Sequence, residues 1–225
     1  AAQSAYDAHW AVVKDAEEKA DAEHAAKLAA AEKAYADYDA TVPGRFSAWD
    51  MQQSMGATAW TPLTPGSMKT SNDAKIEAEA DNAIFVSGPN ADFVTYDVLV
   101  ETELKGINGF RLEALADTRL PGSGPGRSGS GNFVLTELIV EVWPKGHPDQ
   151  KQKVTLRGAK ADFSQSGYDV ATAIDGQTPG EANGWAVSPQ VGKNHEAIFE
   201  CAEPINIEGP VVIQFTMDQR FQDKT

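Results

Sequence analysis

Aromatic side chains give the first indication of ligand-binding chemistry in this chain. Proteins recognise sugars with an exposed aromatic ring that stacks on the pyranose face and with polar groups that hydrogen-bond the hydroxyls. Trp143 stands before Pro144 at the end of an apolar run, and Tyr168 lies in the polar segment SQSGYD. We therefore predict that both rings are exposed and contact a ligand. Trp60 and Trp185 stand in strand-like contexts that favour burial.

A glycine- and proline-rich segment holds another candidate. Residues 111–137 read RLEALADTRLPGSGPGRSGSGNFVLTE, with apolar runs on both sides. Glycine tolerates positive φ and close backbone approach, and proline fixes φ, so a loop of defined shape is expected. Arg127 stands among its backbone amides and is a candidate ligand contact. The interpretation we favour is that Arg127 pins the loop through carbonyls or pairs with Glu113 or Glu137. The loop lacks the Gly-Lys-Ser/Thr ending of a nucleotide-binding P-loop.

The sequence carries no catalytic signature. A serine nucleophile elbow and a His-Glu-x-x-His motif are missing, and no pair stands out among the 33 acidic residues. His195 follows Lys193 and Asn194 at an expected loop-to-strand turn and is a further candidate ligand contact. His9 and His24 lack the i, i+4 spacing of a metal-binding pair. We predict that the protein is not an enzyme.

Composition excludes several classes of protein. The chain has 225 residues, a net charge of −14 and an isoelectric point near 4.6, and it has no Lys/Arg cluster of the kind that contacts nucleic-acid phosphates. Cys201 is the one cysteine, so no intrachain disulfide, cysteine-based zinc site or haem-attachment pair can form. Its alternating apolar context predicts a buried structural thiol. No apolar run approaches the roughly 20 residues of a membrane span.

The first 42 residues are expected to form one long helix. They are rich in Ala, Glu, Lys and Asp and contain no Gly or Pro, and Pro43 and Gly44 are expected to end the helix. A narrow alanine-rich stripe follows a repeat near 3.5 residues, which indicates a coiled-coil-like arm. A lone helix of this length has little to bury. We expect it to pack on the following domain, on a second copy or on another helix.

Residues 46–225 show short apolar runs broken by turns, which are typical of strands. Residues 93–100 alternate cleanly, and no βαβ pattern is visible. We predict an antiparallel jelly-roll β-sandwich. The predicted strands are 49–55, 58–63, 75–80, 83–86, 92–103, 107–115, 133–143, 152–158, 159–164, 185–187, 195–201 and 211–217.

Four segments carry a resemblance to a known family. They are residues 59–98 with a Trp-x-x-Leu opening, residues 106–140 with Leu-Pro-x-x-Gly-Pro-Gly-Arg and Gly-Asn-Phe-Val-Leu, residues 168–200, and residues 209–221. Together they resemble the β-sandwich module of large secreted planctomycete proteins that often also carry a cytochrome c-like segment. The resemblance covers residues 49–221. It implies an extracellular or periplasmic protein that handles polysaccharide, with no haem in this part of the chain.

The third segment is also similar to discoidin-type, galactose-binding-like domains. The matching residues are Ala173, Asp175, Gly176 and Trp185. This chain departs from the usual pattern by the insertion GQTPGEANG before Trp185 and by Gln177, which replaces the usual Asn after the glycine. In those domains the motif marks a structural calcium site. The resemblance therefore implies a calcium ion here.

Calcium is held by six to eight oxygens, many of them backbone carbonyls. Residues 174–178 offer the Asp175 carboxylate, the Thr178 hydroxyl and several carbonyls, and Glu137 or Glu200 would supply a second carboxylate. The alternative is that Asp175 only caps a turn.

These observations predict a non-catalytic carbohydrate-binding module, stabilised by calcium, whose partner is a polysaccharide or oligosaccharide. The alternative is a structural or protein-interaction domain that has no glycan ligand, with the N-terminal helix pairing with another helix. An exposed aromatic ring beside a groove favours the first interpretation, and a smooth acidic surface favours the second.

Overall fold

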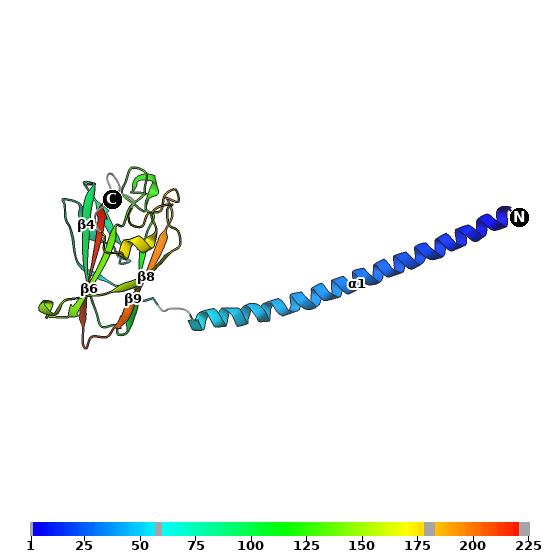
Figure 1. The fold of residues 1–225 in the computed structure, drawn as a ribbon, viewed down its shortest axis with the longest axis horizontal. Coiled ribbons are helices and arrows are strands. Elements are labelled where there is room, and N and C mark those ends of the chain that lie inside the picture. Colours follow the sequence, from blue (N-terminus) through cyan, green and yellow to red (C-terminus); the bar gives the residue numbers. More distant parts are fainter. Residues whose placement is uncertain (1, 57–59, 178–182, 221–225) are drawn as a thin grey trace. The chain divides into compact units, whose positions relative to one another are not determined.

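The computed structural model describes residues 2–56, 60–177 and 183–220 (Figure 1). The chain divides into two compact units, residues 1–59 and residues 60–225. The first contains the helix α1, and the second contains antiparallel sheets, so the fold is mainly β with one N-terminal α-helix.

Helix α1 spans Ala2–Gly56, which makes the predicted end before Pro43 wrong. Proline lacks an N–H and costs about 3 kcal/mol inside a helix, but its fixed φ is itself helical. The helix continues on both sides of Pro43, and the Thr41 hydroxyl donates to the Tyr38 carbonyl oxygen at 2.7 Å. The strand predicted at 49–55 is likewise wrong, because these residues belong to α1. None of the described helices is both long and apolar enough to cross a membrane.

A five-stranded antiparallel sheet has the strand order β1-β4-β10-β6-β7. Its strands are β1 (Pro65–Thr70), β4 (Phe93–Thr102), β6 (Glu137–Pro144), β7 (Gln152–Lys153) and β10 (Val211–Arg220). In β4 the predicted alternation is confirmed, since Val94, Tyr96, Val98 and Val100 are buried. Strand β10 lies between β4 and β6 and pairs with both along most of its length.

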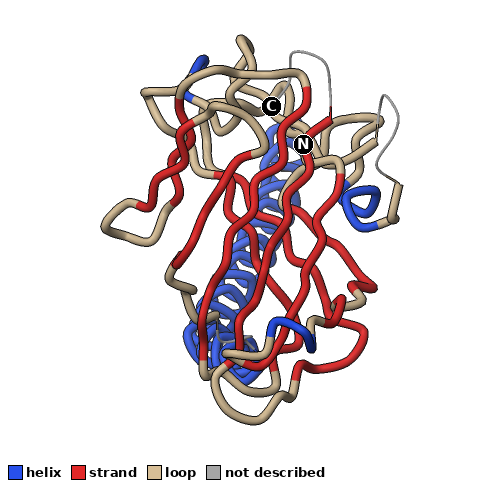
Figure 2. Tube along the Cα trace, turned by 90° about the vertical axis from the view of Figure 1, so that its left-hand side faces the viewer, coloured by secondary structure: helices blue, strands red, loops and turns tan. Residues whose placement is uncertain are grey.

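A three-stranded antiparallel sheet has the order β5-β9-β8, and β2 and β3 form a separate hairpin. These strands are β2 (Lys75–Ala78), β3 (Ile84–Ser87), β5 (Ile107–Ala114), β8 (Leu156–Ala161) and β9 (His195–Ile205). Three short 3-10 turns are η1 (Pro121–Ser123), η2 (Pro148–Gln150) and η3 (Val170–Ile174). Figure 2 shows the strands running alongside one another, with loops gathered at their ends.

Side chains of both sheets form one hydrophobic core. It includes Phe110 and Phe199 from the three-stranded sheet and Val140 and Ile213 from the five-stranded sheet. The Phe110 ring meets the Phe215 ring edge-on at 5.1 Å between centroids. The expected burial of Cys201 is confirmed, and this burial raises the pKa of its thiol.

Strand β6 begins later than predicted, at Glu137 instead of residue 133. The residues before it are buried without joining a ladder. Asn132 explains the difference: its Oδ1 atom accepts hydrogen bonds from the backbone amides of Val187 and Ser188, both at 3.0 Å. A side chain thus satisfies backbone donors there, and the strand predicted at 185–187 is reduced to one bridge between Leu135 and Trp185.

Candidate ligand-binding site

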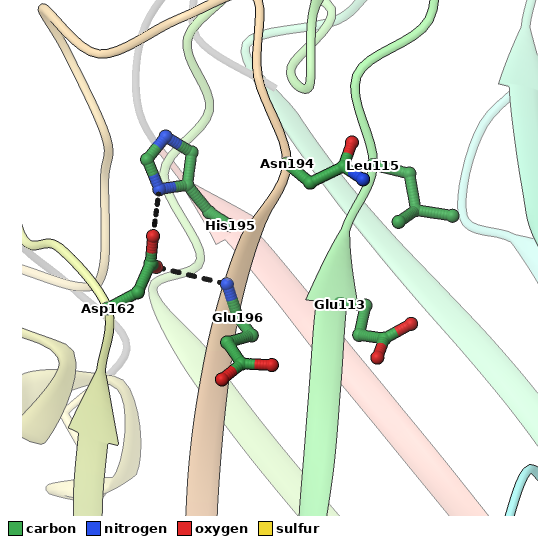
Figure 3. A pocket seen from close by; sticks show the side chains of 6 residues that line it. All are labelled: Glu113, Leu115, Asp162, Asn194, His195 and Glu196. Atoms are coloured by element: carbon green, nitrogen blue, oxygen red, sulfur yellow. Dashed lines mark hydrogen bonds and ion pairs between the residues drawn. The ribbon is translucent and has the colours of Figure 1, made fainter. Parts of the chain in front are cut away.

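One open hollow of about 340 Å³ lies at the end of the three-stranded sheet (Figure 3). The side chains that line it come from β5, from β9 and from the segments that adjoin these strands and β8. They are Glu113, Leu115, Asp162, Asn194, His195 and Glu196. The loop-facing ends of three strands thus bring together residues that are distant in sequence.

Strand alternation decides which side chains face outward here. In β5, Phe110 is buried while Glu113 on the opposite face is exposed. In β9, His195, Ala197 and Phe199 point inward, so Glu196 points outward. Glu113 and Glu196 are direct partners in the antiparallel register. Glu113 and Glu196 thus begin a row of carboxylates across the sheet. Asp162 extends this row, because its N–H donates to the Glu196 carbonyl oxygen at 3.1 Å.

Arg111 holds the two glutamates of this row. Its guanidinium contacts Glu113 at 2.6 Å and Glu196 at 3.8 Å. Like charges directly opposite on neighbouring strands repel each other, and the shared cation offsets that repulsion. The same guanidinium lies over the ring of Trp60, at 5.5 Å from the centroid. Trp60 is only partly buried, although its strand-like sequence context favours burial.

His195 has a positioning role in this site. Its side chain is fully buried, with Nδ1 at 2.8 Å from Asp162 Oδ2 and Nε2 at 2.6 Å from the Gln190 carbonyl oxygen. The second oxygen of Asp162 accepts a hydrogen bond from the backbone N–H of Glu196 at 3.0 Å (Figure 3). His195 therefore orients Asp162, which in turn fixes the backbone of Glu196. The sequence placed His195 at the correct turn but did not reveal these buried partners.

Asn194 completes the polar lining. Its Oδ1 atom accepts a hydrogen bond from the backbone N–H of Ala116 at 2.8 Å. This contact orients the amide and makes Nδ2 the group of this side chain that can donate to a ligand. Leu115 is 39% exposed and adds an apolar surface beside it.

The two aromatic residues predicted as ligand contacts lie outside the hollow. Trp143 is only 6% exposed, so its predicted exposure is wrong. The Lys151 ammonium lies over its ring, 4.7 Å from the centroid, and covers it. Tyr168 is partly buried in a turn whose backbone is closed by the hydrogen bond from its own N–H to the Gln165 carbonyl oxygen. Trp185 is fully buried, as expected.

Arg127 makes the loop-pinning contacts that we favoured over a ligand contact. Its guanidinium donates to the Gly88 and Pro89 carbonyl oxygens at 2.8 and 2.9 Å, and to the Tyr96 hydroxyl at 3.2 Å. Asn90 donates in return to the Arg127 carbonyl oxygen at 3.1 Å. These contacts join the glycine-rich loop to the segment before β4.

The residues expected to bind calcium are partly brought together. Glu137 is 3% exposed, and both its carboxylate oxygens accept from the Gly176 N–H at 3.2 Å. Burial raises the pKa of Glu137, and the nearby Asp175 carboxylate raises it further. Asp175 Oδ1 also accepts from the Gln177 N–H at 2.8 Å, which is the turn-capping contact of the alternative interpretation.

The other two oxygen donors considered for calcium do not add to this pair. Thr178 lies outside the described residues. Glu200 faces Arg157 and Lys160, both at 3.9 Å. Within the described part of the chain, no group of three or more His, Cys, Asp or Glu side chains is arranged to hold a metal ion.

Comparison with known proteins found no match to a family model, a curated protein or a solved structure.

The hollow was missed by sequence analysis because it depends on strand pairing. Glu113 and Glu196 become neighbours only when β5 pairs with β9. The alternation of apolar and polar residues around Glu113 and Glu196 does predict that both side chains face outward. This is the one feature of the sequence that points to the hollow.

Proposed function

We propose that residues 60–225 form a non-catalytic carbohydrate-binding module. The observation that carries the proposal is the hollow at the end of the three-stranded sheet, where carboxylates, an amide and an apolar side chain meet. The finer topology that we propose is a jelly roll of the galactose-binding-like type, in an extracellular or periplasmic protein related to the planctomycete modules.

The chemistry of the lining suits sugar hydroxyls. The Glu113 and Glu196 carboxylates accept hydrogen bonds, and the Asn194 amide donates one. Leu115 offers apolar contact to the C–H groups of a sugar ring. Trp60, partly exposed and stacked against Arg111, supplies an aromatic surface beside the carboxylate row. Polar groups held in place by Arg111 and Asp162 reduce the entropy lost on binding.

A polysaccharide pull-down tests this proposal. The chain is incubated with insoluble algal, plant and microbial glycans, with and without EDTA, and the bound fraction is measured. Retention on at least one glycan is expected. Failure to bind any of these glycans would sink the proposal.

We further propose that calcium stabilises the loop after η3. Glu137 and Asp175 converge there, and an ionised carboxylate has about four acceptor sites, of which the Gly176 N–H engages only part. Two carboxylates that interact electrostatically, as these do, suit a hard cation with oxygen ligands. Glu137 and Asp175 would hold the ion together with backbone carbonyls of the loop.

Thermal unfolding with and without calcium checks this metal proposal. Saturating calcium is expected to raise the melting temperature, because ligand at about 100 times its Kd adds roughly 2.7 kcal/mol of stability. Asp175→Asn should remove the effect, while Asp73→Asn, at an exposed position far along the chain, should retain it. An unchanged melting temperature in EDTA and in calcium would end the idea.

The alternative function, a protein-interaction domain without a glycan ligand, draws its support from α1. Large apolar side chains along this helix are exposed, among them Tyr35 at 72% and Phe46 at 62%. Such a surface suits a protein partner more than a sugar.

A further inference from the structure

Most of the exposed large apolar side chains of helix α1 lie on one stripe. Successive stripe positions are three or four residues apart, so they fall on one face of the helix. The exposed members, each at least 41% exposed, are Tyr6, Trp10, Leu28, Tyr35, Tyr38, Val42 and Phe46. The remaining stripe positions are Val13, Glu17, Ala20, His24 and Ala31. Val12, at 69% exposed, is off the stripe.

The stripe runs along most of the helix, with most of its large apolar side chains toward its two ends and Glu17, Ala20 and His24 in its middle. From Tyr6 to Phe46 the helix rises about 60 Å at 1.5 Å per residue. Helices in proteins owe most of their stability to the packing of an apolar face, and intrahelical ion pairs such as Lys19–Asp15 at 2.7 Å add only a few tenths of a kcal/mol each. The pattern indicates a surface that packs against a second helix.

We propose that a second copy of this chain covers the stripe, with the two α1 helices antiparallel. The positions of the stripe are nearly symmetric about residue 26. Members at equal distances from this point, within one residue, would face each other across a two-fold axis. The resulting pairs are Tyr6 with Phe46, Trp10 with Val42, Val13 with Tyr38, Glu17 with Tyr35, Ala20 with Ala31, and His24 with Leu28.

Side-chain size favours the antiparallel pairing. It places Trp10 opposite Val42 and Val13 opposite Tyr38, so that a large residue faces a smaller one at these positions, and the alanines meet near the centre. The one pair of two large residues, Tyr6 with Phe46, lies at the ends of the stripe. A parallel pair in register would place Trp10 against Trp10 and Ala20 against Ala20. The bulky pair would then hold the helices apart where the small pair needs close approach.

Charge also favours the antiparallel pairing. In a parallel pair Glu17 would face Glu17 of the second copy within the seam, whereas in the antiparallel pair it faces Tyr35, whose hydroxyl can donate to a carboxylate. Residues on either side of the stripe form its two flanks. In an antiparallel pair the same flank of each helix faces the other helix. Lys14 then lies near Asp39 on one flank, and Glu23 lies near Lys27 on the other.

One flanking contact opposes the antiparallel arrangement and supplies a directional test. Asp21 and Glu32 lie on the same flank and would face each other across the antiparallel pair. Glu32→Lys would convert this repulsion into an attraction. In a parallel pair residue 32 faces the opposite flank, near Ala34, and the substitution would bring no such gain.

Sedimentation equilibrium of the whole chain tests association. The wild-type chain should form dimers, and Trp10→Glu should raise the dissociation constant about tenfold or more, which corresponds to roughly 1.4 kcal/mol. Val12→Glu is the matched control, since it changes an exposed apolar residue of the same turn that is off the stripe. It should leave the dissociation constant unchanged. A wild-type chain that stays monomeric at its highest soluble concentration would overturn the proposal, as would equal effects of the two variants.

Disulfide trapping tests the orientation in a Cys201→Ser background. A mixture of Ala20→Cys and Ala31→Cys chains should give the mixed disulfide, and Glu32→Lys should tighten the dimer. Self-linked Ala20→Cys dimers as the main product would overturn the antiparallel arrangement. These outcomes do not depend on the glycan proposal, because no residue of the hollow is changed.

Discussion

At the scale of single residues, hydrogen-bond donors determine whether the pKa of a wholly or partly buried carboxyl is raised or lowered. Burial opposes the charged form of Asp97, but hydrogen bonds from Thr216 at 2.6 Å and Gln214 at 2.9 Å, together with the Lys69 ammonium, outweigh it and lower the pKa of the carboxyl. Among the residues that the structure describes, Glu137 accepts from the Gly176 N–H, and burial raises the pKa of its carboxyl. Asp97 thus contributes stability in its ionised form, whereas burial disfavours the ionised form of Glu137.

The lowered pKa of Asp97 predicts a pH-dependent stability. Because the folded state favours the ionised carboxylate, its contribution is present above the unfolded pKa of about 3.9 and is lost as the pH falls through the folded value. Asp97→Asn should therefore lower the free energy of unfolding by about 1–2 kcal/mol at pH 7. The gap to the wild type should close in acid. Urea unfolding across this pH range measures it.

Glu103→Gln provides the control, since it changes an exposed carboxylate just after the same strand. A gap between Asp97→Asn and the wild type that stays constant down to the acid limit would contradict the assigned role of the ionised carboxylate.

At the scale of elements, the glycine-rich loop between β5 and β6 has a shape that only glycine permits. A Cβ on Gly126 would lie 1.9 Å from the Asn132 carbonyl oxygen, closer than any real contact. The loop backbone closes there through a hydrogen bond from the Gly126 N–H to the Gly131 carbonyl oxygen at 2.8 Å. Arg127 then ties the loop to the segment before β4. The loop is part of the framework of the domain and lies outside the proposed sugar site.

Two alanine substitutions in this loop should differ sharply. Gly126→Ala forces the backbone apart and should destabilise the domain by several kcal/mol, roughly the cost of severe overpacking. Gly129→Ala meets nothing within 4 Å and should cost little. Thermal unfolding of both variants makes the comparison. Equal melting temperatures would show that the loop does not have the described shape.

The sequence predicted the local features of the elements better than their partners. The alternation in β4 and β9 and the burial of Trp185 follow from residue type and period. The predicted end of α1 was wrong because the helix continues through Pro43, whose fixed φ is itself compatible with a helix. The hollow could not be predicted, because Glu113, Asp162 and Glu196 meet only through strand pairing. Trp143 was predicted as exposed because it stands before Pro144 at a strand end, and this prediction failed because the long side chain of Lys151 lies over its ring.

At the scale of the whole molecule, the two compact units suit different tasks. The unit of residues 60–225 carries a hollow of carboxylates and an amide, and the helix α1 carries a long exposed apolar stripe. The net charge of −14 disfavours nucleic acid and strongly acidic glycans as ligands of the hollow. The proposed glycan, which would be neutral or cationic, and the proposed self-association through α1 would together account for both surfaces.

The affinity of one variant tests the central claim most directly. Glu196→Gln removes an outward carboxylate of the hollow and keeps its shape, while Glu203→Gln changes an exposed carboxylate near the far end of the same strand. With the glycan that the wild type retains best, calorimetric titration should show about tenfold weaker binding for Glu196→Gln, since hydrogen bonds to charged groups contribute roughly 1.5–3 kcal/mol. Glu203→Gln should bind as the wild type does. Unchanged binding by Glu196→Gln would contradict the assignment of the hollow as the sugar site.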